Sequence, residues 1–150
     1  MRTALFGIAW LACALQAHAA DIAANCPALP GPHQDWLAQE HAVWQDVCQG
    51  RKAALQPPSA ELTAHFLATI LLDPPFRARI REAGIDITGA HVQDELNLGN
   101  AKFDFDVTLA RTRFDKRLNL RAIETSRNLK LTGSSFLGSQ PGDALDLAGA

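Results

Sequence analysis

The 150-residue sequence lacks several features that would point to particular functions. It has no strong excess of charge, since 14 Lys and Arg residues face 16 Asp and Glu residues. Proteins that bind nucleic acid in bulk usually carry a large basic excess, so we expect no nucleic-acid partner. The chain has no C-x-x-C pair, which argues against a redox site. It also has no apolar run long enough to cross a bilayer about 30 Å thick, so we expect no transmembrane segment.

Residues 1–20, MRTALFGIAWLACALQAHAA, predict a cleaved signal peptide. Arg2 is the positive n-region, residues 5–15 are the apolar core, and Ala17-His18-Ala19 matches an A-x-A cleavage site. The expected location of the mature protein is therefore the periplasm or the extracellular medium. The alternative is a lipoprotein anchored through Cys13, but the residues before this cysteine are a poor match to a lipidation site.

Cysteine is scarce, and its distribution fits an exported protein. Removal of the signal peptide takes away Cys13 and leaves only Cys26 and Cys48. An even pair in an exported chain most often forms a disulfide, so we expect a Cys26–Cys48 bond. Such a bond would contribute roughly 3 kcal/mol in the chain-entropy model. The alternative is a pair of free thiols.

The first half of the mature chain has helical patterning. Residues 21–32 contain three prolines and a glycine and predict an irregular lead-in. Residues 33–83 then carry apolar residues at helical spacings, which predicts an α-helical cap. We expect one helix over 33–49, a second that begins at Ser59 as its N-cap, and a third over 74–82.

Only one group in this helical part suggests a metal site, namely His33, Glu40 and His41. The two histidines are eight residues apart, which is more than two helical turns, so their imidazoles would not converge on one ion. We therefore expect Glu40 and His41 to lie on a solvated helix face, and we expect no metal or cofactor.

The second half of the chain, residues 84–150, repeats every eleven residues. The template is L-x-L-x-x-A-x-F-x-x-x, in which positions one and three are always Ile, Leu or Val. The successive units are IDITGAHVQDE (85–95), LNLGNAKFDFD (96–106), VTLARTRFDKR (107–117), LNLRAIETSRN (118–128), LKLTGSSF (129–136) and LDLAGA (145–150).

This alternation of apolar and polar residues predicts two short strands per unit, each with one buried face. The runs are not separated by Asn-Gly or Asp-Gly turns, so hairpins are not expected. A chain that keeps turning in the same direction stacks as a parallel β-helix. Two units make a four-sided coil of 22 residues, and about three coils are expected. Asn97 should then stack on Asn119, while Leu109 and Leu120 point towards the axis.

The run FLATILLDPPFRARIREAGIDITGAHVQDELNLGNAKF, followed by L-x-L-x-x-A-x-F units, resembles a group of bacterial exported proteins with a pentapeptide-repeat-like β-helix. The resemblance covers about residues 66–150. It implies a right-handed, four-sided parallel β-helix with an N-terminal helical cap. The sequence departs from the strict five-residue pattern, because its step is eleven residues. The resemblance implies a scaffold or a binding surface and assigns no catalytic residue.

The expected binding surface is basic. Arg111, Arg113, Lys116 and Arg117 form a dense run of one sign within the repeats. Such a surface could hold a protein or an anionic glycan by electrostatic attraction. Phe114 is the only aromatic residue within this run, so base stacking is not indicated. The alternative is a solvated face whose cations are partly ion-paired.

Four carboxylates, Asp94, Glu95, Asp104 and Asp106, lie at successive corners of the predicted coils. Clustered carboxylates could bind calcium or act as an acid–base pair. Residues half a coil apart lie on opposite sides of a solenoid, so we do not expect these four to share a site. Since no nucleophile–base arrangement is visible either, the favoured interpretation is non-catalytic. The alternatives are an enzyme acting on an acidic glycan and a truncated product without a function of its own.

The final unit, LDLAGA, stops at position six of the template. A finished solenoid needs a terminal coil with a polar outer face, so we expect the chain to be a truncated piece of a longer β-helix. The alternative is a short protein that associates end to end through this coil.

Overall fold

The computed structural model describes residues 35–57, 60–80, 82–138 and 144–149. The predicted signal peptide, the lead-in and Cys26 lie outside these ranges. Cys48 is disulfide-bonded, and its partner also lies outside them. Within the described ranges, no helix has the length and apolar character needed to span a bilayer.

Three α-helices precede the strands: α2 (Ala38–Cys48), α3 (Ala64–Leu72) and α4 (Pro74–Ile80). The third begins where it was predicted, but the first two begin later than expected. The N-cap of α3 is Thr63 rather than Ser59, because the Thr63 hydroxyl accepts the Phe66 N–H at 3.0 Å. This bond satisfies one of the free N–H groups at the start of the helix.

Glu40 is buried, so the prediction that it lies on a solvated helix face is wrong. Its side chain is 1% exposed. One carboxylate oxygen accepts the Leu37 N–H at 2.8 Å, and the other accepts both the N–H and the hydroxyl of Thr63 at 2.7 Å. A buried carboxylate is tolerated when hydrogen bonds replace its water. Glu40 therefore ties the first turn of α2 to the N-cap of α3.

The strands are short, and most contain two residues. The first four are β1 (Ala53–Ala54), β2 (Ile85–Thr88), β3 (His91–Val92) and β4 (Leu96–Asn97). The next four are β5 (Lys102–Phe103), β6 (Val107–Ala110), β7 (Arg113–Phe114) and β8 (Leu118–Asn119). The last four are β9 (Glu124–Thr125), β10 (Leu129–Lys130), β11 (Ser135–Phe136) and β12 (Leu145–Asp146).

These strands form four parallel sheets in a solenoid-like stack. The strand orders are β1-β2-β6-β10, β11-β7-β3, β12-β8-β4 and β5-β9. Val107 pairs with Ile85 on one side and with Leu129 on the other, so paired residues are 22 apart. Asn97 pairs with Asn119, as the repeat predicted. Leu118 pairs with Leu145, which is 27 residues away, because the last coil contains an insertion.

One strand lies within the segment 33–83 that was predicted as an α-helical cap, between its first two predicted helices. Ala53 and Ala54 of β1 pair in parallel with Ile87 and Thr88, and Glu61 forms an isolated bridge to His91. The residues between α2 and α3 therefore extend two of the sheets before the first full coil begins.

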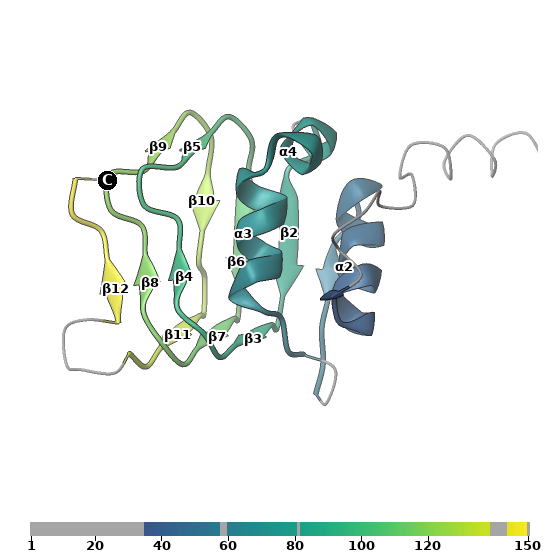
Figure 1. Cartoon of the computed structure of the whole chain (residues 1–150), viewed down its shortest axis with the longest axis horizontal. Coiled ribbons are helices and arrows are strands. Elements are labelled where there is room, and N and C mark those ends of the chain that lie inside the picture. Colours follow the sequence, from purple (N-terminus) through teal and green to yellow (C-terminus); the bar gives the residue numbers. More distant parts are fainter. Residues whose placement is uncertain (1–34, 58–59, 81, 139–143, 150) are drawn as a thin grey trace, which may run out of the picture.

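Helices and strands share one hydrophobic core. Figure 1 shows the helices at the N-terminal end of the stack and β12 at the other end. The α3 side chains Phe66, Leu67 and Ile70 are fully buried, and α3 contacts β4 of the first coil. Leu109 and Leu120 are each 1% exposed, which confirms that they point inward. Burial of such a leucine stabilises the fold by about 1.5–3 kcal/mol.

The fifth position of every unit adopts a left-handed backbone conformation. Three units have glycine there: Gly89, Gly133 and Gly149, with φ between 69° and 79°. The other three have Asn100, Arg111 and Ala122, with φ of 60°, 50° and 50°. This conformation costs an L-residue roughly 1–2 kcal/mol. In these three units the corner therefore imposes a backbone conformation that the residue at this position does not itself favour.

We expect Leu109→Asp and Leu120→Asp each to destabilise the protein by more than about 4 kcal/mol, because each buries an unpaired carboxylate. Asn119→Asp should cost only about 1 kcal/mol, because this side chain faces outward and loses one amide hydrogen bond. Urea unfolding of the three variants measures both effects. Losses of equal size would show that inward and outward positions are misassigned.

Ala122→Gly should stabilise the protein by about 0.5–1 kcal/mol, since glycine relieves the left-handed strain and loses only a partly exposed methyl group. Ala110→Gly is the matched control, because Ala110 lies in β6, one position earlier in the template. This substitution should lower the stability of the protein by about 0.5–1 kcal/mol. Thermal melts would compare the two. Destabilisation by both substitutions would count against the corner assignment.

Candidate functional site

The predicted basic run is spread around two corners of one half-coil. Arg111 follows β6, Arg113 lies on β7, and Lys116 and Arg117 lie between β7 and β8. These elements belong to three different sheets. The structure therefore does not gather the four cations onto a single face.

Three of the four predicted cations form ion pairs. The Arg113 guanidinium lies 2.6 Å from Asp115, Lys116 Nζ lies 3.0 Å from Asp94, and Arg117 lies 2.6 Å from Asp146. The Lys116–Asp94 pair and the Arg113 guanidinium are exposed, and exposed pairs contribute little to stability, typically about 0–1 kcal/mol, whereas the Arg117–Asp146 pair is partly buried. Arg111 makes no ion pair with any residue that the structure describes, so it remains accessible to an external anion.

A polar cluster on the outer face of the β3–β7 sheet surrounds Asp115. The Asp115 carboxylate accepts hydrogen bonds from Arg113 Nε at 2.6 Å and from His91 Nε2 at 2.7 Å. These two bonds hold the pKa of Asp115 below its usual value, and the bond from Arg113 has the larger effect. His91 and Asp115 come from neighbouring coils, so the cluster ties one coil to the next. No hydroxyl nucleophile bonds to His91 among the described residues.

A ladder of polar side chains runs along the β4–β8–β12 sheet. Asn97, Asn119 and Asp146 each accept the backbone N–H two residues further along the chain, at 2.9–3.0 Å. The Asn119 amide also donates to Asn97 at 3.0 Å. Hydrogen bonds from the Ala148 N–H and from Arg117 hold the pKa of Asp146 below its usual value, and the bond from Ala148 has the larger effect. These side chains satisfy the corner backbone and leave little unused bonding capacity for a ligand.

A different group of cations has no ion-pair partner. Arg127 and Lys130 lie next to Asp106, yet neither forms a salt bridge with any described residue. Asp106 is bonded instead to Asn128, accepting its backbone N–H at 3.0 Å and its side-chain N–H at 2.8 Å. These two bonds hold the pKa of Asp106 below its usual value, with smaller contributions from the charges of Arg127 and Lys130.

Arg111 belongs to the same side of the stack as Arg127 and Lys130. Lys130 lies on β10 and Arg127 comes just before it, while Arg111 follows β6, the strand with which β10 pairs. The Arg111 side chain lies against Gly133, where an added Cβ would come within 3.3 Å of Arg111 Cγ. We call Arg111, Arg127 and Lys130 the β6–β10 basic edge. All three side chains are exposed.

The four corner carboxylates do not form a shared site. Asp94 pairs with Lys116, Asp104 with Arg77, and Asp106 with Asn128. In the part of the chain that the structure describes, no group of three or more His, Cys, Asp or Glu residues is placed to hold a metal ion.

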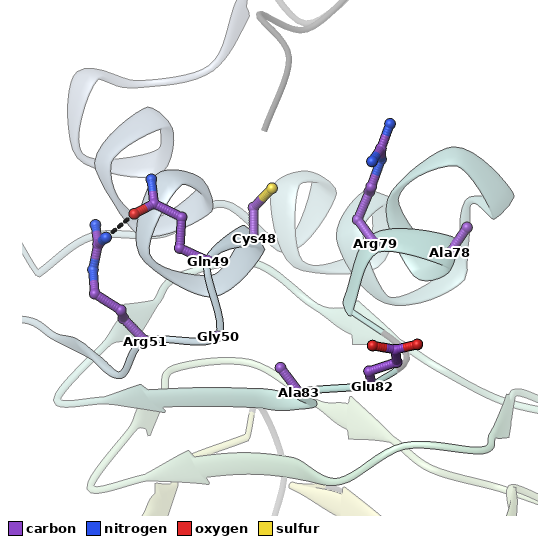
Figure 2. Close-up of a pocket in the computed structure, with 8 residues that line it drawn as sticks. All are labelled: Cys48, Gln49, Gly50, Arg51, Ala78, Arg79, Glu82 and Ala83. Carbon is purple, nitrogen blue, oxygen red and sulfur yellow. Dashed lines mark hydrogen bonds between the residues drawn. The ribbon is translucent and has the colours of Figure 1, made fainter. Parts of the chain in front are cut away.

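Several hollows lie beside the helices. One of about 670 Å³ lies between the C-terminal end of α2 and helix α4 (Figure 2). Its lining residues are Cys48, Gln49, Gly50, Arg51, Ala78, Arg79, Glu82 and Ala83. A shallower hollow of about 390 Å³ follows β5 and β9, and Arg77 and the Lys102–Glu124 ion pair lie along it. Neither hollow contains a nucleophile next to a base among the described residues.

Comparison with known proteins returns no similarity on which to rest an assignment. No family model, curated protein or solved structure matches this chain.

Proposed function

We propose that the chain is an exported, non-catalytic binding module that holds an anionic glycan on the β6–β10 basic edge. It would be exported by the signal peptide at residues 1–20, act in the periplasm or outside the cell, and carry the Cys26–Cys48 disulfide. The module would be a right-handed, four-sided, pentapeptide-repeat-like β-helix with an N-terminal helical cap.

Several features of the fold support this architecture. The four parallel sheets and their 22-residue register fit a coil with four sides. Right-handedness is the general rule for connections between parallel strands, because twisted strands return to their sheet most easily in that sense. The helices pack at the end of the stack where the first coil begins, which is the place of a cap.

One observation carries the choice of ligand: the cations of the β6–β10 basic edge have no salt bridge to a described residue, whereas most other cations of the repeats do. Unpaired cations are already free to bind an anion and need not first lose an internal partner. Arg113, Lys116 and Arg117 have carboxylate partners, so we place them outside the binding surface. Export and the burial of Phe114, the aromatic residue within the basic run, favour a glycan over a nucleic acid.

Retention on immobilised heparin tests this proposal, because the whole protein carries a net charge of −2 and only a local surface would bind a polyanion. The wild-type protein should be retained at about 50 mM salt, where screening is weak. The triple variant Arg111→Glu, Arg127→Glu, Lys130→Glu should pass through the column.

The matched control is Lys102→Glu, Arg113→Glu, Lys116→Glu, which changes the net charge equally but reverses cations that have ion-pair partners. It should still be retained. The proposal is wrong if the wild-type protein passes through. It is also wrong if both variants lose retention to the same degree, since net charge alone would then explain binding. Circular dichroism confirms that each variant is folded.

A further inference from the structure

The corner that carries Arg111 is held in place by a serine of the next coil. The Ser134 hydroxyl accepts the Thr112 N–H at 3.0 Å and donates to the Leu109 carbonyl at 2.8 Å, so it joins the residues on both sides of the corner. The Arg111 N–H itself donates to the Thr132 carbonyl at 2.9 Å. Hydrogen bonds therefore fix the backbone from which the Arg111 side chain projects.

A second hydroxyl holds the corner that carries Arg127. The Thr125 side chain donates to the Arg127 carbonyl at 2.7 Å and accepts the Arg127 N–H at 3.2 Å. A hydroxyl that bonds to the backbone two residues further along the chain stabilises a turn. The next residue, Asn128, donates both its backbone and its side-chain N–H to Asp106 of the preceding coil. Both arginines of the β6–β10 basic edge thus project from braced corners.

The two arginine side chains are also open to a ligand. Arg111 and Arg127 are exposed, and neither guanidinium bonds to a residue that the structure describes. Gly133 leaves room for the stem of Arg111, since an added Cβ would come within 3.3 Å of Arg111 Cγ. Asp106, the carboxylate near Arg127, already accepts two hydrogen bonds from Asn128. An external anion therefore meets guanidinium donors that no described residue uses.

We infer that Arg111 and Arg127 are the two anchors of the glycan site and that each binds an oxyanion group of the glycan through paired N–H···O bonds. Ser134 and Thr125 are the positioning residues of these anchors. A guanidinium is a planar fork that matches an oxyanion with two parallel bonds, whereas a lysine ammonium acts as a point charge. A braced anchor loses less freedom on binding, so geometry adds to affinity. The inference rests on the proposed function, because it concerns the same surface.

The anchors lie at opposite ends of one sheet face. Arg127 comes before β10, and Arg111 follows β6, the parallel partner of β10. A strand of four residues such as β6 is roughly 13 Å long. Lys130 lies on β10 between the two anchors and contributes its charge. The ligand must span both anchors, which a chain of several sugars can do and a single sugar cannot.

Charge-conserving substitutions test the anchors by calorimetric titration with a heparin oligosaccharide at about 50 mM salt, where screening is weak. Arg111→Lys and Arg127→Lys keep the net charge and lose only the fork. Each should raise the dissociation constant about three- to tenfold. Arg113→Lys is the matched control, because the Arg113 guanidinium is paired with Asp115 outside the binding surface. It should leave the dissociation constant unchanged.

Removal of the bracing hydroxyls tests the positioning residues. Ser134→Ala and Thr125→Val leave every charge in place and should each raise the dissociation constant about two- to fivefold. The matched controls are Ser135→Ala and Ser126→Ala, since these neighbouring hydroxyls are exposed and bond to no described residue. Both controls should bind like the wild-type protein. Thr125→Ser keeps the hydroxyl and should also bind like the wild-type protein. Thermal melts confirm that each variant is folded.

A double-mutant cycle separates positioning from a general loss of stability. In the Arg127→Ala background, Thr125→Val should cause no further loss of affinity, because the hydroxyl acts through Arg127. An equal loss in both backgrounds would overturn the positioning role. Wild-type affinity in both lysine variants would overturn the anchors but leave the proposed function intact, since charge alone would then hold the glycan. Absence of binding by the wild-type protein would overturn the proposed function, and this inference with it.

Discussion

The structure depends on one constraint: each coil must lie in register on the coil before it, with paired residues 22 apart. In this register inward apolar residues stack on one another along a sheet, as Ile85, Val107 and Leu129 do. The backbone hydrogen bonds of two-residue strands are too few to hold a sheet alone. The apolar column and the bonds between coils must therefore form together, so a residue out of register disturbs both.

The register also determines the outer surface. Side chains one coil apart meet, and the repeats use this contact for opposite charges or paired amides: Asp94 with Lys116, Lys102 with Glu124, and Asn97 with Asn119. Charges with partners of this kind contribute mainly to the alignment of coils. Binding is then left to the side chains that the ladder does not use, which is why the proposed glycan site lies among them.

The eleven-residue repeat predicted the stacked coils and the inward leucines, because burial selects apolar residues at fixed intervals. The same arithmetic could have identified the pairs between coils, since Asp94 and Lys116 are 22 apart. It could not have identified Arg117 with Asp146, because the insertion in the last coil changes the interval. Burial of Glu40 was also hidden, since it depends on Thr63 of another helix and leaves no periodic signal. The pairing of β1 likewise depends on a partner far along the chain.

Duplication of one coil tests the central claim most directly. A second copy of residues 96–117, inserted after Arg117, adds one full period and keeps every later strand in register. The account predicts a folded protein with a cooperative melt at no more than about 5 °C below that of the parent. Duplication of residues 96–111 alone, inserted after Arg111, adds 16 residues instead of 22. It puts the later strands out of register and should abolish the cooperative melt. Unfolding of the full-coil variant, or equal melts for both variants, would contradict the account.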